Sequence, residues 1–181
     1  MRRLATLFFL PALAVIGAGI VVGAGLVDFS ASASPSRLEE RAAQFALNRS
    51  IARHAPNQKN PLSDSSEAIT AGLVLFRAHC VTCHGAPGVD PTEEGASLNP
   101  PAPGLTLSRV QARPDGELYW IVSHGIRMTG MPAFKDSLSD TQMWEVSLLL
   151  ANADKISPAV KNILAQPATA AQPPAKTAPI R

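Results

Sequence analysis

The stretch Cys80-Val81-Thr82-Cys83-His84 decides the interpretation of this chain, and it holds both cysteines of the 181-residue sequence. Two thiols followed at once by an imidazole form the C-x-x-C-H pattern, the attachment signature of c-type haem. On a helical turn, residues three apart lie on one face, so both sulfurs can meet one edge of a flat macrocycle. His84 can then reach the iron as an axial ligand. The stretch therefore predicts one covalently bound haem c.

Three other kinds of site also use a cysteine pair. A redox-active dithiol usually lies near a βαβ pattern, and none is found in this sequence. A zinc site needs about four ligands, which here would have to include scattered histidines because no second cysteine pair is present. A plain disulfide is the third possibility. The position of His84, together with the N-terminal segment, favours haem over all three.

The N-terminal segment predicts a membrane anchor. Arg2 and Arg3 precede an uncharged run over residues 4–27, which ends at Asp28. At about 1.5 Å per residue, about two dozen helical residues cover a hydrocarbon core of ~30 Å. The arginines favour a cytoplasmic N-terminus, which places the rest of the chain in the periplasm or an equivalent outer compartment. A cleaved signal peptide is the alternative because residues 31–33 read Ala-Ser-Ala, although signal h-regions span only about 7–15 residues.

Changes in composition divide the chain into four parts. Residues 1–29 are the anchor or signal segment, 30–60 a basic linker, 61–165 the domain proper, and 166–181 a Pro/Ala-rich tail. The tail lacks hydrophobic periodicity, so we expect it to be disordered.

The linker contains a predicted helix over residues 37–54. Ser36 can cap its N-terminus, with Glu39 at the third helical position. Apolar residues recur at helical spacing at Leu38, Ala42, Phe45 and Ala46, and the basic residues are Arg37, Arg41, Arg49 and Arg53. Such a helix can lie on an anionic membrane surface, dock on a partner, or be a solvated spacer.

Charge is distributed unevenly along the chain. Residues 1–60 contain seven Lys or Arg and three Asp or Glu, whereas residues 61–156 contain six against eleven. An acidic domain suits a basic docking patch on a redox partner, mainly through the association rate. The basic residues lack interleaved aromatics, so nothing in the sequence indicates nucleic-acid binding.

Three helices are predicted within the domain, which indicates an all-α fold. The first covers residues 66–80 and is capped by Ser65 or Ser66; the second covers residues 116–123, with Asp115 as its cap and Gly125 as its stop. Ser139 can cap the third, which runs to about residue 153 and has Met143, Val146, Leu149 and Leu150 on its apolar side. Long Pro- and Gly-rich stretches separate the helices, and a large cofactor would supply the apolar surface that they wrap.

Residues 66–154 resemble a class I cytochrome c. The resemblance rests on the C-x-x-C-H stretch, on Gly72 and Phe76 at eight and four residues before the first cysteine, and on Gly130-Met131-Pro132-Ala133-Phe134. It implies the cytochrome c fold, in which the helix with Gly72 and Phe76 crosses the C-terminal helix. Trp144 and Leu148 are the facing residues it implies. It also implies that Nδ1–H of His84 donates to a carbonyl of the proline loop, at Pro100 or Pro101.

The same resemblance implies that Met131 is the second axial ligand. Pro132 supports this choice, because a proline disfavours the helical region for the residue before it and leaves Met131 in an extended loop. Met128 remains the alternative ligand. His79, His124 and Met143 are further donors, expected to lie beside the proximal helix, in solvent and in the core, respectively. Trp120 or Arg127 could contact a haem propionate. The alternative is that Trp120 is a core residue and Arg127 a solvated surface residue.

These features predict a membrane-anchored, monohaem carrier of single electrons rather than an enzyme. His/Met ligation fills both axial positions and raises the reduction potential relative to His alone. The protein would act with redox partner proteins, either alone or as the cytochrome subunit of a respiratory dehydrogenase or oxidase complex. The alternatives are a peroxidase-like haem enzyme with an open sixth position and a haemless thiol or metal protein.

Overall fold

The computed structural model describes residues 2–86, 89–105, 108–153 and 155–156, and all regular secondary structure in these ranges is helical. The chain divides into two compact units, residues 1–35 and 36–181. Each is described by itself. The predicted tail over residues 166–181 lies outside the described residues.

The first unit consists of helix α1 (Arg2–Gly23) and the chain that follows it. The helix ends where the N–H of Leu26 donates to the carbonyl of Val21 and Gly25 adopts a φ of 69°. Among the helices whose residues are described, none meets the length and hydropathy needed to cross a bilayer. The anchor at residues 1–29 therefore remains a prediction.

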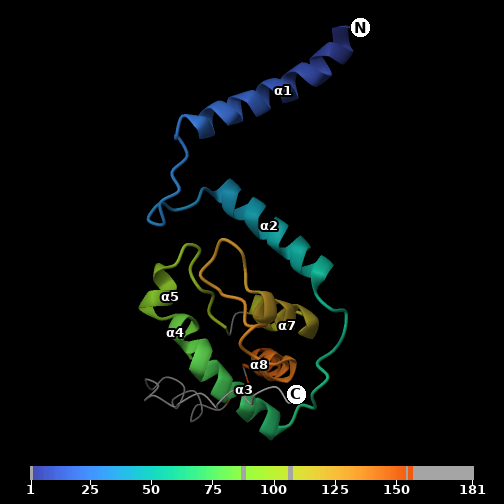
Figure 1. Cartoon of the computed structure of the whole chain (residues 1–181), viewed down its shortest axis with the longest axis vertical. Helices are drawn as coiled ribbons and strands as arrows, with labels where there is room; N and C mark the ends of the chain where they lie inside the picture. Colours follow the sequence, from blue (N-terminus) through green and yellow to red (C-terminus); the bar gives the residue numbers. More distant parts are fainter. Residues whose placement is uncertain (1, 87–88, 106–107, 154, 157–181) are drawn as a thin grey trace, which may run out of the picture. The chain divides into compact units, whose positions relative to one another are not determined.

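Helix α2 (Arg37–His54) opens the second unit, and the predicted cap is confirmed. Ser36 Oγ accepts a hydrogen bond from the N–H of Glu39 at 3.2 Å, which satisfies one of the free donors of the first turn. The C-terminal end of α2 lies beside α7 (Asp115–His124), as Figure 1 shows. The predicted linker thus contains a helix that packs on the rest of the unit.

Helices α3 (Ser66–His79) and α8 (Asp140–Ala151) cross each other and form the centre of the unit. Both follow the predicted caps. Ser65 caps α3, and Ser139 forms a full capping box with Gln142, in which each side chain bonds to the other residue's backbone N–H. Both helices end one or two residues earlier than predicted.

Gly72 marks the point of closest approach between α3 and α8. A side chain at this position would overlap the carbonyl oxygen of Glu145 and lie 3.2 Å from Cβ of Leu149. The residues that face Gly72 are therefore Glu145 and Leu149, and the expectation of Trp144 and Leu148 was wrong by one position. Trp144 instead turns towards α7, where it stacks on Tyr119 with ring centroids 4.2 Å apart, and this contact fixes the rotation of α8.

Helix α7 was predicted nearly in full, but its cap was not. Pro114, with a ψ of 147°, occupies the N-cap position, and no side chain caps the helix. The carboxylate of Asp115 accepts the N–H of Asn60 at 2.9 Å, so it is already engaged by the chain before α3. Gly125 ends the helix as predicted, with a φ of 63°.

The core lies where α3, α7 and α8 meet. Its buried side chains include one from α3 and several from α7 and α8: Phe76, Leu118, Val122, Met143, Val146 and Leu149. Three short helices interrupt the connections: α4 (Val81–His84), α5 (Glu93–Ser97) and α6 (Ser108–Gln111). The long connections therefore run on one side of a small three-helix core.

Replacing Gly72 by alanine is expected to lower the free energy of unfolding by about 1–3 kcal/mol, because the methyl group overlaps a backbone carbonyl that cannot rotate away. Denaturant unfolding of the purified holoprotein, followed by circular dichroism, measures this loss. Gly19→Ala is the matched control, since nothing lies within 4 Å of that position. Equal stability of the two variants would contradict the close crossing.

Candidate haem-binding site

The two cysteines lie on one helical turn that continues α3. The N–H of Cys80 donates to the carbonyl of Phe76 at 2.8 Å, and the N–H of His84 donates to the carbonyl of Cys80 at 2.9 Å. The two thiols are therefore one turn apart on a rigid helix end, with His84 directly after them. Neither cysteine forms a disulfide, and both are partly buried.

The environment keeps the first thiol neutral. Burial, together with the smaller effect of the neighbouring Cys83, raises the pKa of Cys80 to about 12. A thiol with this pKa carries almost no thiolate at neutral pH, and the thiolate is the form that binds metal ions or attacks disulfides. This position therefore suits a thioether better than a reactive dithiol.

A backbone carbonyl orients the ring of His84. Nδ1 of His84 lies 3.0 Å from the carbonyl oxygen of Pro103. A carbonyl can only accept, so Nδ1 carries the proton and the neutral ring has its free lone pair on Nε2. A hydrogen bond of this kind fixes the tautomer of a metal-binding histidine. Pro100 and Pro101 were expected as the acceptor, and that assignment was wrong by two or three residues.

The proline loop reaches this position because it is tied to α5. The N–H of Ala102 donates to the carbonyl of Gly95 at 2.9 Å, one residue before the carbonyl that His84 uses. A side chain at Gly95 would overlap the carbonyl of Cys83, so the backbone of α5 lies directly on the cysteine turn. Helix α5 was missed by sequence reasoning. Its signal is Thr92, whose Oγ1 accepts the N–H of Gly95, followed by two glutamates in the first turn.

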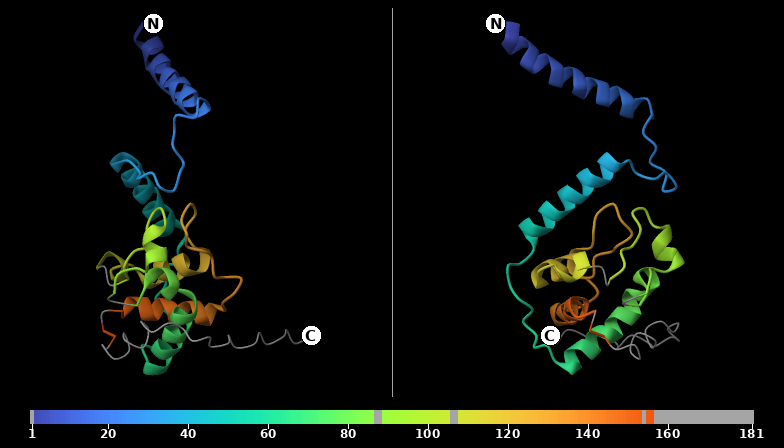
Figure 2. Two further views of the ribbon diagram at one scale, coloured as in Figure 1. Left: turned by 90° about the vertical axis from the view of Figure 1, so that its left-hand side faces the viewer. Right: turned by 180° about the vertical axis from the view of Figure 1, so that it is seen from behind.

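Met131 lies in the connection between α7 and α8. Its side chain is partly buried. The carbonyl of Met131 accepts the N–H of Ile126 at 3.2 Å, and its N–H donates to Thr129 Oγ1 at 3.1 Å. These two bonds close a short loop that begins where α7 ends. In Figures 1 and 2 this connection, in orange, lies at the same end of the unit as α4 and α5.

Met128 occupies the tip of the same loop but faces the solvent. It is 85% exposed and adopts a φ of 59°, in the left-handed region that non-glycine residues rarely adopt. Gly130, the neighbour of Met131, packs against the side chain of Leu98, with a Cβ built there only 2.6 Å from Cδ1. Leu98 begins the loop that carries Pro103. The structure thus brings the loop of Met131 against the loop that orients His84.

The remaining candidate donors lie elsewhere. His79 is exposed and contacts the ring edge of Phe134, with centroids 5.9 Å apart. His124 is exposed as expected, and its Nδ1 lies 2.7 Å from Ser123 Oγ. Met143 is a core residue with 2% exposure, also as expected.

Trp120 and Arg127 were considered for contact with a haem propionate. Trp120 is half-buried and stacks on His124 at 4.9 Å and on His54 at 6.2 Å, rather than lying in the core. Arg127 is exposed. Within the ranges that the structure describes, no three His, Cys, Asp or Glu side chains gather as they would around a metal ion.

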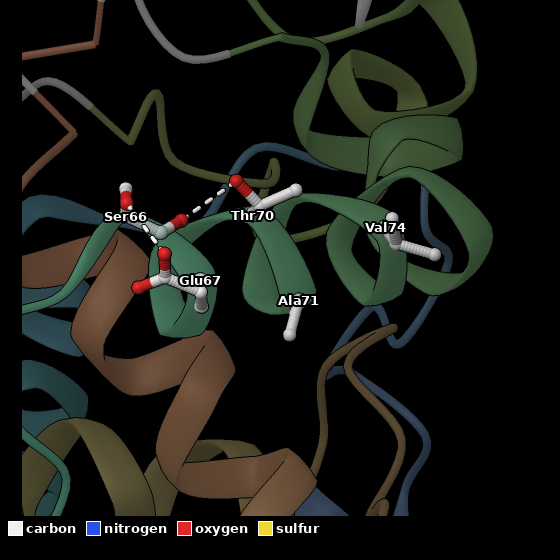
Figure 3. A pocket seen from close by; sticks show the side chains of 5 residues that line it. All are labelled: Ser66, Glu67, Thr70, Ala71 and Val74. Atoms are coloured by element: carbon white, nitrogen blue, oxygen red, sulfur yellow. Dashed lines mark hydrogen bonds between the residues drawn. The ribbon is translucent and has the colours of Figure 1, made fainter.

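A shallow hollow on the outward side of α3 is a separate feature, shown in Figure 3. Its described lining consists of Ser66, Glu67, Thr70, Ala71 and Val74. Thr70 Oγ1 donates to the carbonyl of Ser66 at 2.7 Å, and Val74 is 64% exposed. These side chains come from one helix face, and none is a donor of the candidate site. The hollow is therefore separate from the candidate site.

The donor set at the helix end fits a haem c. Two thiols one turn apart can each form a covalent bond to one edge of the porphyrin. An oriented imidazole with a free lone pair on Nε2 can serve as an axial ligand of the iron. Comparison with known proteins agrees. Residues 67–148 match the family model of cytochrome c oxidase, cbb3-type, subunit III. No curated protein matches the chain. The match supports a cytochrome c domain at residues 67–148, and such a domain implies electron transfer through haem.

Proposed function

We propose that the protein transfers single electrons through one haem c, joined to Cys80 and Cys83 and ligated by His84 and Met131. The observation that carries this proposal is the contact of His84 Nδ1 with the Pro103 carbonyl, directly after the cysteine turn. When bound, the haem iron supplies the redox chemistry by alternating between its ferric and ferrous states. The chain supplies the fixed imidazole, the attachment turn and the loops that exclude water.

Met131 is preferred over Met128 as the second ligand for two reasons. Met131 is partly buried and its loop packs on the loop that orients His84, whereas Met128 is 85% exposed. A thioether favours ferrous iron and raises the reduction potential. With both axial positions filled, no position remains open for a substrate, which supports an electron carrier over a peroxidase-like enzyme.

We further propose that the domain works outside the cytoplasmic membrane, in the periplasm or an equivalent compartment, and that residues 1–29 anchor it as a single-pass helix. The support comes from Arg2, Arg3 and the uncharged run over residues 4–27. The protein would serve redox partner proteins as a carrier or as the cytochrome subunit of a respiratory dehydrogenase or oxidase complex. The family that residues 67–148 match is named for a subunit of an oxidase.

Replacing Met131 by alanine is expected to abolish the Met–iron charge-transfer band near the red edge of the ferric spectrum and to lower the reduction potential. The reason is that the iron loses its thioether ligand. Met128→Ala is the matched control and should leave both quantities unchanged, because its side chain lies in solvent. Visible spectra and a redox titration of the purified holoproteins measure both effects.

Two results would contradict the ligand assignment in different ways. Loss of the band in Met128→Ala, but not in Met131→Ala, would make Met128 the ligand. A high-spin ferric spectrum of the unsubstituted protein would mean an open sixth position and would favour the haem enzyme.

A further inference from the structure

Helix α2 contacts the rest of its unit with one side only, near its C-terminal end. Ile51 is 0% exposed, Asn48 Oδ1 accepts a hydrogen bond from Arg113 at 2.9 Å, and His54 stacks on Trp120. The N-terminal end of α2 extends away from α7 and α8 in both views of Figure 2. None of these contacts involves the opposite side of α2, whose side chains are exposed in the part of the chain that the structure describes.

That opposite side has a distinct composition. At about 100° per residue, Leu38 and Phe45 point away from Ile51, and they are 79% and 69% exposed. The same arc of about 120° contains only alanines and arginines besides these two, and all of these residues are exposed: Arg41, Ala42, Arg49, Ala52 and Arg53. Glu39 and Glu40 lie outside it. We call these seven residues the outer face of α2.

The outer face combines two large apolar side chains with three positive charges. Within the described residues, none of the three arginines of the outer face forms an ion pair. A helix with this distribution binds at the boundary between headgroups and acyl chains, where Leu38 and Phe45 can be buried and arginines meet anionic headgroups.

Two further observations select a lipid surface. Thirteen residues separate the end of α1 at Gly23 from the start of α2 at Arg37. Such a segment reaches at most about 45 Å, so the proposed anchor would keep α2 within that distance of the membrane. In addition, residues 61–156 carry six basic against eleven acidic side chains. An anionic membrane would repel that part of the chain and attract α2.

We propose that the outer face of α2 lies on the anionic lipid headgroups of the membrane that anchors the chain. The proposal rests on the membrane anchoring proposed above. It gives the protein a second attachment to the bilayer, which orients the haem domain relative to the membrane instead of leaving it on a free tether.

The test uses the full-length holoprotein with Ala42→Cys, because the proposed haem occupies both native cysteines and leaves the new thiol for labelling. An environment-sensitive fluorophore is attached, and the protein is reconstituted into vesicles of phosphatidylcholine alone or mixed with phosphatidylglycerol. A spin-labelled headgroup lipid serves as quencher. Thr141→Cys, on the exposed side of α8, is the control label.

We expect the quencher to reach the label at residue 42 in the anionic vesicles, to reach it little in the neutral ones, and to reach the label at residue 141 in neither. Adding Arg41→Gln, Arg49→Gln and Arg53→Gln should weaken docking about 100-fold, at about fivefold for each arginine. Raising the salt concentration should weaken it as well.

The outcomes separate this proposal from the proposed anchor. Flotation of the chain with neutral vesicles tests the anchor alone, and failure there would refute anchoring whatever the label shows. A chain that floats but keeps its residue-42 label in water in anionic vesicles refutes the docking of α2 on lipid. Burial of that label only when a co-purified membrane protein shares the bilayer would assign the outer face to a protein partner and overturn the lipid proposal.

Discussion

Replacing Phe76 by alanine is expected to lower the free energy of unfolding by about 3–5 kcal/mol. Phe76 is 1% exposed and belongs to the core between α3, α7 and α8. Its removal leaves a cavity in a small core, whose backbone is held in place by the crossing at Gly72. Denaturant unfolding of the holoprotein, followed by far-UV circular dichroism, measures the loss.

Phe45→Ala is the matched control, because the same atoms are removed from a side chain that is 69% exposed. Its stability should remain within about 0.5 kcal/mol of that of the unsubstituted protein. An equal loss in the two variants would mean that the outer face of α2 is covered within the protein, and it would contradict both the assigned core and the lipid proposal.

The features that sequence reasoning predicted well depend on neighbours along the chain. Ser36, Ser65 and Ser139 all cap helices as expected, since a cap is formed by residues three positions apart. Gly125 ends α7 because the chain needs a positive φ there. The order of Cys80, Cys83 and His84 on one turn likewise follows from local spacing alone.

The features that it missed depend on partners far away in the sequence. Asp115 was expected to cap α7, yet its carboxylate bonds to Asn60, 55 residues earlier. The Nδ1–H of His84 donates to the carbonyl of Pro103 because the neighbouring Ala102 is held by the carbonyl of Gly95. The spacing of residues in the sequence does not reveal such a contact.

Helix α2 shows the same limit for hydrophobic patterns. The apolar stripe of Leu38 and Phe45 was the visible signal, but the contact with α7 is made by Ile51 near the other end of the helix. The buried side chain of Ile51, one hydrogen bond from Arg113 to Asn48 and the stack of His54 on Trp120 determine which side of α2 faces α7. The stripe remained on the outside, where it needs a different explanation.

Replacing both Cys80 and Cys83 by serine is expected to abolish covalently bound haem and, with it, most of the folded structure around the site. Most of the described core lies on three helices, whereas the cysteine turn, α5 and the Met131 loop contact one another mainly through backbone and glycine contacts. The cofactor supplies the apolar surface that these loops would otherwise lack. Haem staining after denaturing electrophoresis should be lost, and far-UV circular dichroism should show reduced helicity.

Thr82→Ser is the control for this experiment, since its exposed side chain lies between the two cysteines and takes no part in attachment. It should retain haem staining, and each single cysteine variant should retain a haem held by one bond. Staining of the double variant at the level of the unsubstituted protein would show that these thiols do not hold the haem. An unstained band from the unsubstituted protein, expressed in cells competent for cytochrome maturation, would refute the haem assignment itself. It would leave a thiol or metal protein, for which a pKa of about 12 at Cys80 makes a reactive dithiol a poor choice.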